Sequence, residues 1–257
     1  MKKFHYISIL IVMMALTSWS QQLPQYTQYM LNDYAFNPAV AGTKDYYRGV
    51  FSQRYQWTGI DDAPRTFIMS ANGPLKKRNM GLGGYLMNDK TGPASQTSFY
   101  LSYSYIVKLN DAFKASFALS GGIMQYVLDG SKVLLEDPDD NVLSNGIQYS
   151  TLPDAGFGFY LYTNRFYFGG SAPQLFNSRY NFFENGINGQ SSLERHYYFT
   201  SGVRLGDESS ALNLTPSILL KYVDPVPLQI EGSIKADYLN MVWMGLSYRH
   251  EDALAIL

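Results

Sequence analysis

The residues from Ser98 to Ile123, SFYLSYSYIVKLNDAFKASFALSGGI, decide the fold. In the first half, every second side chain from Phe99 to Val107 is aromatic or aliphatic, and serines occupy half of the positions between them. The same period of two resumes at Phe113, with lysine and serine on the opposite face. Strict alternation over more than ten residues is typical of a β-strand with two unlike faces. The short polar turn at Leu109–Asp111 then predicts an antiparallel hairpin.

The same pattern recurs along the chain from Tyr46 onwards. Most of the predicted strands are near the ~9–11 residues that cross a bilayer when tilted. We therefore expect an all-β fold, an antiparallel transmembrane outer-membrane β-barrel with about 11 to 12 strands. The further strands are predicted at Tyr46–Trp57, Arg65–Gly73, Met80–Asn88, Asp154–Tyr162, Phe166–Ala172, Arg195–Leu205, Ala211–Tyr222, Gln229–Tyr238 and Val242–Arg249, with the start of another at Ala253–Leu257.

The connections between these strands are predicted to alternate in length. Outer-membrane barrels have short periplasmic turns and longer external loops, whereas a soluble β-sandwich shows no such parity and a lipocalin-like barrel needs only eight strands. If the N-terminus is periplasmic, every tight turn falls inside and every longer loop outside. Tight turns are predicted at Leu75–Asn79, Leu109–Asp111, Thr163–Arg165, Gly206–Ser210 and Leu239–Met241, and longer loops at Thr58–Pro64, Asp89–Ala94, Val127–Pro153, Pro173–Glu194 and Val223–Leu228.

The N-terminus has the parts of a secretory signal. Lys2 and Lys3 precede an apolar run from Ile7 to Leu16, and small residues at 17–20 suit cleavage. The run is about half the ~20 apolar residues of a transmembrane anchor. We expect residues 1–20 to be the signal peptide, 21–44 a periplasmic lead-in or plug segment, and 45–257 the barrel. The sequence predicts eleven full strands and only the start of a twelfth, at Ala253–Leu257. Because single-chain barrels of this kind have an even number of strands, we expect the barrel to be incomplete at its C-terminus.

Composition narrows the class of protein further. The chain has 22 Tyr, 15 Phe and 22 Gly among 257 residues, with only 16% charged residues, which suits strands and interfacial aromatic belts. Removal of Lys2 and Lys3 would leave 18 basic against 21 acidic residues, a net charge of −3 that does not indicate a nucleic-acid partner. The absence of cysteine excludes a lipid-modified cysteine and a disulfide framework.

The search for reactive groups predicts no catalytic residue, no cofactor and no metal site. Besides His5, the chain has only His196 and His250, both near strand ends, and no serine stands in a nucleophile-elbow motif. The acidic run Asp137–Asn141 lacks the glycine and glutamate of a calcium loop, so we interpret it as a solvated loop tip. Gly81–Gly84 lies within a strand pattern, where no helix follows to bind phosphate. The basic run Lys76–Arg78 falls in a predicted periplasmic turn.

Four charged side chains are predicted on the polar faces of strands, at Arg48, Arg54, Lys114 and Glu231. In a barrel, those faces point inward. They could form lumenal ion pairs, line a selective pore or provide a docking surface for a protein segment. The sequence leaves these alternatives open.

Several short motifs follow one another in a specific order: Gln25–Met30, Asn37–Gly42, Arg54–Gly59, Ala63–Thr66, Gly81–Gly83, Asn88–Pro93, Tyr103–Tyr105, Pro153–Gly156 and Phe166–Ser171. In this order the chain resembles the PorP/SprF family of type IX secretion system membrane proteins of Bacteroidetes, from Gln21 to about Leu257. Within these motifs we assign fold-specifying roles to turn-forming, close-packing and interfacial residues. These residues are Asn37, Pro38, Gly42, Arg54, Trp57, Pro64, Gly92 and Pro93.

The resemblance implies a protein of the cell outer membrane that belongs to the secretion and gliding apparatus and has no enzymatic activity. Its implied partners are the lipid bilayer, type IX secretion components and a secreted cargo protein with a C-terminal sorting domain. The loops Val127–Pro153 and Pro173–Glu194, or the lumenal face, would contact that cargo. The alternatives are a transporter barrel for small hydrophobic solutes, with residues 21–44 as its plug, and an outer-membrane hydrolase with a Ser/His pair at one rim.

Overall fold

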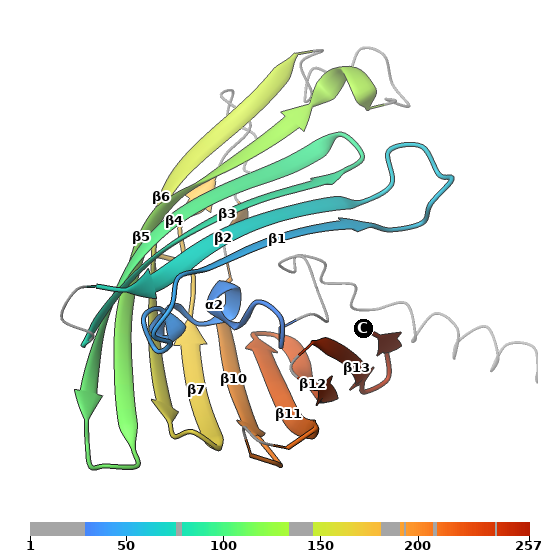
Figure 1. Cartoon of the computed structure of the whole chain (residues 1–257). Coiled ribbons are helices and arrows are strands. Elements are labelled where there is room, and N and C mark those ends of the chain that lie inside the picture. Colours follow the sequence, from blue (N-terminus) through green and yellow to red (C-terminus); the bar gives the residue numbers. More distant parts are fainter. Residues whose placement is uncertain are drawn as a thin grey trace, which may run out of the picture.

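The chain forms one large antiparallel sheet that curves around its own N-terminal residues (Figure 1). The computed structural model describes residues 29–75, 79–133, 146–180, 191–192, 194–207, 210–239 and 241–257. In these residues, twelve strands follow one another in the sheet in chain order, which confirms the predicted all-β antiparallel fold. They are β1 (Arg48–Tyr55), β2 (Arg65–Pro74), β3 (Met80–Thr91), β4 (Ala94–Lys108), β5 (Lys114–Asp129), β6 (Ile147–Tyr162), β7 (Phe166–Ala172), β10 (His196–Val203), β11 (Leu212–Val223), β12 (Val226–Tyr238), β13 (Val242–Arg249) and β14 (Ala253–Ile256).

The sheet is not closed within the described residues. Strand β1 pairs with β2 and strand β14 with β13, and no pairing joins β1 to β14. The structure therefore supports the predicted barrel only in part. A two-stranded hairpin, β8 (Arg179–Tyr180) and β9 (Ser191–Ser192), interrupts the connection between β7 and β10, where the sequence predicted a loop.

The two faces of the sheet differ as the alternation predicts. On β4, Leu101 and Tyr103 are exposed on the convex face, while Ser102 and Ser104 are buried on the concave face. Large aromatic and aliphatic side chains are exposed on the convex side of nearly every strand. A soluble monomer rarely exposes apolar patches larger than a few hundred Å². The convex face is thus suited to hydrocarbon and the concave face to polar partners.

The predicted alternation of short and long connections holds only in part. The tight turn at 163–165 is present as predicted, and the connections from β2 to β3 and from β12 to β13 are short, as predicted. However, two of the predicted longer loops are two-residue turns, Gly92–Pro93 between β3 and β4 and Asp224–Pro225 between β11 and β12. Gly92 has φ +58°, a conformation that glycine adopts without strain, so the ladder continues to the pair Thr91 and Ala94. Both predicted loops are wrong because β3, β11 and β12 continue beyond the residues in which apolar side chains alternate.

Helices are short in the described part of the chain. They are α2 (Asp33–Phe36), the 3₁₀ turn η1 (Pro38–Val40) and the 3₁₀ turn η2 (Gly130–Lys132). None of the helices among the described residues has the length and apolar character needed to cross a membrane. The basic run Lys76–Arg78 and the acidic run Asp137–Asn141 lie outside the described residues.

We expect Leu101→Arg, in the middle of β4, to destabilise the folded protein in phospholipid vesicles by about 2–4 kcal/mol, because a charge at the bilayer midplane loses its hydration. Val107→Arg, on the same face near the end of β4, is the matched control and should cost about 0–1 kcal/mol. Denaturant unfolding in vesicles measures both. Equal costs for the two variants would contradict a convex face that contacts lipid.

Candidate functional site

The N-terminal segment, Tyr29–Lys44, lies against the concave face of the sheet (Figure 1). It contains α2 and η1, and its described side chains and backbone groups bond to strands that are far apart in the sequence. Six strands contribute such bonds, namely β1, β2, β4, β6, β7 and β11. This segment is the candidate functional site because it occupies the space that a pore or a docking surface would use.

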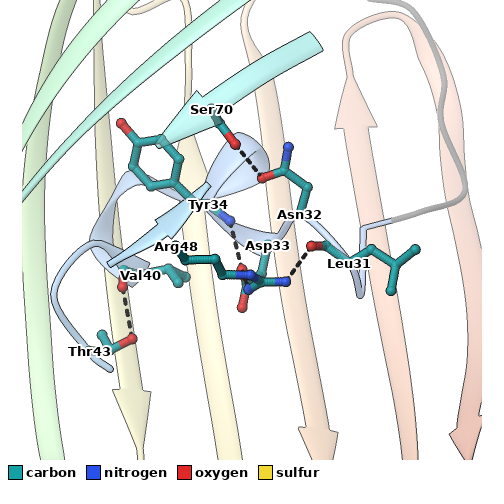
Figure 2. Close-up of polar contacts among 8 residues, drawn as sticks. All are labelled: Leu31, Asn32, Asp33, Tyr34, Val40, Thr43, Arg48 and Ser70. Atoms are coloured by element: carbon teal, nitrogen blue, oxygen red, sulfur yellow. Dashed lines mark hydrogen bonds and ion pairs between the residues drawn. The ribbon is translucent and has the colours of Figure 1, made fainter. Parts of the chain in front are cut away.

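Figure 2 shows the polar contacts at the start of the segment. The Arg48 guanidinium on β1 donates to Asp33 Oδ1 at 2.8 Å and also to the Leu31 carbonyl oxygen. Ser70 on β2 donates to Asn32 Oδ1 at 3.0 Å. The two bonds of Arg48 explain why an arginine suits this position, since its planar fork can reach two acceptors at once. Arg48 thus forms an ion pair on the concave face of the sheet, in line with one of the alternatives that the sequence left open.

Asn37 links the segment to β6 while it caps η1. Its Oδ1 accepts from the Ala39 backbone N–H at 2.9 Å, and its Nδ2 donates to the Phe159 carbonyl oxygen at 2.8 Å. Pro38 occupies the first position of η1, where its missing N–H would have no helical partner. The Asn-Pro pair therefore both starts the 3₁₀ turn and anchors it to the sheet.

Two further bonds join the segment to β4. The hydroxyls of Tyr34 and Ser102 lie 2.8 Å apart, and Ser104 donates to the Ala41 carbonyl oxygen at 2.6 Å. Burial raises the pKa of the Tyr34 phenol to about 12, so the hydroxyl stays neutral at physiological pH. Ser102 and Ser104 belong to the stretch that decides the fold, and both are buried under the N-terminal segment.

Glycines on the sheet allow the segment to approach closely. A Cβ atom on any of them would come within 3.0 Å of an atom of the segment, closer than real Cβ contacts allow. Gly42 has φ +73°, and its own Cβ would lie 2.6 Å from the Gly81 Cα. Glycine within a strand often marks such a close approach. These contact glycines are Gly81 and Gly83 on β3, Gly158 on β6 and Gly169 on β7.

Apolar side chains of the segment fill the remaining space. Phe36 lies between Tyr29 and Tyr198, with ring centroids 6.3 and 5.4 Å away and both pairs edge to face. Val40 and Tyr34 are each 4% exposed. Each large apolar side chain removed from water contributes roughly 1.5–3 kcal/mol. The segment is thus held by burial as well as by hydrogen bonds.

The segment borders two cavities. In the view of Figure 1, the upper end of the sheet is the end where β5 and β6 connect. A cavity of about 90 Å³, lined by Tyr34, Pro38 and Met124 among others, lies towards this upper end. A cavity of about 670 Å³ lies towards the lower end, where β4–β5, β6–β7 and β10–β11 connect. Phe36 lines both.

The residues predicted to specify the fold do not gather in one place. Asn37, Pro38 and Gly42 belong to the N-terminal segment, as described above. Arg54 is half-buried on the concave face of β1, and Pro64 precedes β2, where its carbonyl oxygen accepts from the Gln56 N–H at 3.0 Å. Gly92 and Pro93 form the two-residue turn between β3 and β4.

Trp57 differs from its predicted place at the end of the first strand. Strand β1 ends at Tyr55, and Trp57 has φ +48°, which an extended strand cannot include. Its side chain is 68% exposed in the loop that follows. The aromatic alternation in the sequence thus extends two residues beyond the end of β1.

The search for reactive groups gives no cluster in the described part of the chain. No group of three or more His, Asp or Glu residues there could hold a metal ion. His196 is buried, and its Nδ1 lies 2.9 Å from the Glu194 carbonyl oxygen. Glu231 forms a buried ion pair with Arg249, with 3.0 Å between Oε2 and Nε, so it is a second ion-paired residue of the concave face.

Several residues of the site were missed in the sequence. Asn32, Asp33 and Tyr34 precede the first strand and belong to no alternating pattern, so no periodicity marked them. The signal that could have found them is the glycine content of β3, because Gly81 and Gly83 leave room on one face for another part of the chain. The sequence showed these glycines but not the segment that covers them.

An antiparallel sheet with an apolar convex face and a polar, occupied concave face defines a membrane protein that crosses the bilayer with β-strands. Within that class, the chain belongs to the PorP/SprF family: the model for "Type IX secretion system membrane protein PorP/SprF" matches residues 18–257. The match confirms the resemblance inferred from the motifs. No curated protein matches the chain.

We expect Gly81→Ala to loosen the N-terminal segment, because the new methyl group would collide with the Ala41 carbonyl group and with Ser104. Such overpacking typically costs about 1–3 kcal/mol. Hydrogen exchange at the backbone of Ala39–Thr43 should be faster in the variant. Gly121→Ala is the matched control, since nothing lies within 4 Å of a Cβ there. Unchanged exchange in Gly81→Ala would contradict a tightly docked segment.

We also expect Asn37→Asp to destabilise the protein by about 1–3 kcal/mol, because the Phe159 carbonyl oxygen would lose its donor and face a carboxylate. The cap on Ala39 is retained, so the loss reports the bond to β6 alone. The control is Asn110→Asp, in an exposed turn where Oδ1 accepts from two backbone N–H groups. Thermal or denaturant unfolding compares them; a cost for Asn37→Asp no larger than that for Asn110→Asp would show that the bond is unimportant.

Proposed function

We propose that the protein is a non-enzymatic outer-membrane component of the type IX secretion and gliding apparatus. In this role it supports the export or surface anchoring of proteins that carry a C-terminal sorting domain. The family membership carries the proposal, and it identifies the chain as a type IX secretion system membrane protein. The apolar convex face supports a location in the outer membrane, in contact with its lipid.

The occupied concave face supports protein recognition over solute transport. The larger cavity falls within the ~300–1,000 Å³ of small-molecule sites, but it is rich in charged side chains. The cavity with mostly apolar walls is about 90 Å³, well below that range. A transporter for small hydrophobic solutes would need the N-terminal segment to leave, which requires breaking its bonds to six strands.

Cargo contact is proposed at the upper end of the sheet, which would face outwards if the N-terminus is periplasmic. The two longest connections between neighbouring strands of the sheet, β5 to β6 and β7 to β10, both leave the sheet at this end. Only parts of these two connections lie within the described residues. Long loops on a rigid sheet are common places for binding surfaces.

Deletion of the gene tests the proposal through the secreted and surface proteomes. Loss of one or a few large proteins with C-terminal sorting domains is expected, and it would indicate a partner dedicated to those cargoes. Loss of all such proteins would instead indicate a core component. Re-expression of the wild-type gene, and of the Gly121→Ala control, should restore the pattern. An unchanged proteome together with impaired uptake of a hydrophobic solute would contradict the proposal and favour the transporter.

A further inference from the structure

The larger cavity, at the lower end of the sheet, has a marked excess of positive charge. Six of its lining residues are basic and two, Asp33 and Asp45, are acidic. The basic side chains come from widely separated places in the sequence, before β1, at the β4–β5 and β6–β7 turns, after β10 and within β12. They are Lys44, Lys108, Lys114, Arg165, Arg204 and Lys235.

Half of these cations already have a carboxylate partner. Lys108 pairs with Asp111, Arg165 with Asp207, and Lys235 with Asp237. The lining carboxylate Asp33 is bound to Arg48. In contrast, no ion pair among the described residues includes Lys44, Lys114 or Arg204, and all three are exposed to the cavity or its mouth.

The cations act on one another inside the cavity. Partial desolvation lowers the pKa of the Lys44 ammonium; Asp33 opposes this, whereas the neighbouring cations Arg204, Arg48 and Lys235 lower the pKa further. A cavity with protein walls in which one sign of charge predominates, here six basic against two acidic lining residues, focuses its electrostatic potential and attracts ligands of the opposite sign. An anionic ligand would therefore relieve repulsion that is built into the site.

The walls between the cations are aromatic. Tyr160 and Tyr167 stack with ring centroids 5.8 Å apart and planes at 26°. Tyr162 and Phe166 extend this surface towards the β6–β7 turn. The positive charges are spread around the cavity at the ends of different strands, which suits a ligand with several separated negative charges. The aromatic surface suits apolar groups between those charges.

We propose that the lower cavity binds an acidic peptide segment of a partner protein, with its carboxylates at Lys44, Lys114 and Arg204 and its apolar side chains on Tyr160 and Tyr167. The site itself follows from the geometry alone. The location of the partner in the periplasm rests on the proposed function, because only that function orients the lower end of the sheet.

The test uses the full protein purified in a neutral detergent and a fluorescein-labelled decapeptide of alternating glutamate and phenylalanine. Binding measured by anisotropy should weaken with rising salt, since the attraction is electrostatic. The double variant Lys44→Gln/Arg204→Gln should weaken binding at least tenfold. Neither side chain makes an ion pair within the described residues, so circular dichroism should show an unchanged fold.

The control is Lys90→Gln/Lys132→Gln, which removes two exposed cations at the upper end of the sheet, of which Lys132 pairs with Asp62 at 3.6 Å, and should change binding less than twofold. Equal weakening by both double variants, or equal binding of a decapeptide with lysine in place of glutamate, would overturn the proposal. Displacement of the peptide by inorganic phosphate at equal concentration would also overturn it, in favour of a small-anion site.

These outcomes are independent of the secretion experiment. Peptide binding with an unchanged proteome would retain the site and contradict only the proposed function. A changed proteome without peptide binding would retain the proposed function and contradict the peptide site.

Discussion

The concave face of the sheet carries hydroxyl, amide and charged groups that need hydrogen-bond partners once they are removed from water, and Tyr29–Lys44 supplies many of those partners. Much of the rest of the structure depends on this constraint. Serines on β2, β4, β7 and β11 bond to the segment, and Arg48 on β1 fixes its start. The segment covers these groups and also bonds to them, which avoids the cost of about 1–3 kcal/mol for each polar group buried without a partner.

Away from the segment, charged and hydroxyl groups on the concave face of β12 and β13 bind one another in an ion-pair network. Arg249 binds Glu231 and Asp252, and Ser247 donates to Glu231 Oε1 at 2.6 Å. A buried ion pair repays its desolvation only where further hydrogen bonds complete it, and the serine provides one. The concave face therefore has two distinct regions, one bonded to the N-terminal segment and one bonded internally.

The strands could be predicted from the sequence because one face contacts apolar surroundings and the other polar ones. That difference imposes a period of two from Phe99 to Val107 and leaves little doubt about which residues share a face. The ends of strands were harder to predict: β3 continues through Asn88–Thr91, where no apolar alternation remains, because a ladder of backbone bonds does not require it. Gly92 and Pro93 mark a turn in the sequence, but the loop predicted around them, Asp89–Ala94, is longer than the observed two-residue turn.

The segment itself could be placed in the chain but not in space. Asn37 and Pro38 mark a turn in the sequence, and the described segment Tyr29–Lys44 precedes β1 in the structure. Their contacts with β6, β7 and β11 depend on the curvature of the whole sheet, which no local pattern records. The contact glycines were visible in the sequence, yet a glycine in a strand is equally consistent with a bulge.

The bond between Tyr29 and Ser217 joins residues that are 188 positions apart. Contacts of such high sequence separation have a large loop-closure entropy, and chains rich in them fold slowly. The N-terminal segment can complete its contacts only after β11 has joined the sheet, although it precedes every strand in the chain. The segment therefore completes its docking late in folding, once β11 is in place. Earlier folding intermediates would expose the contact glycines and the serines next to them.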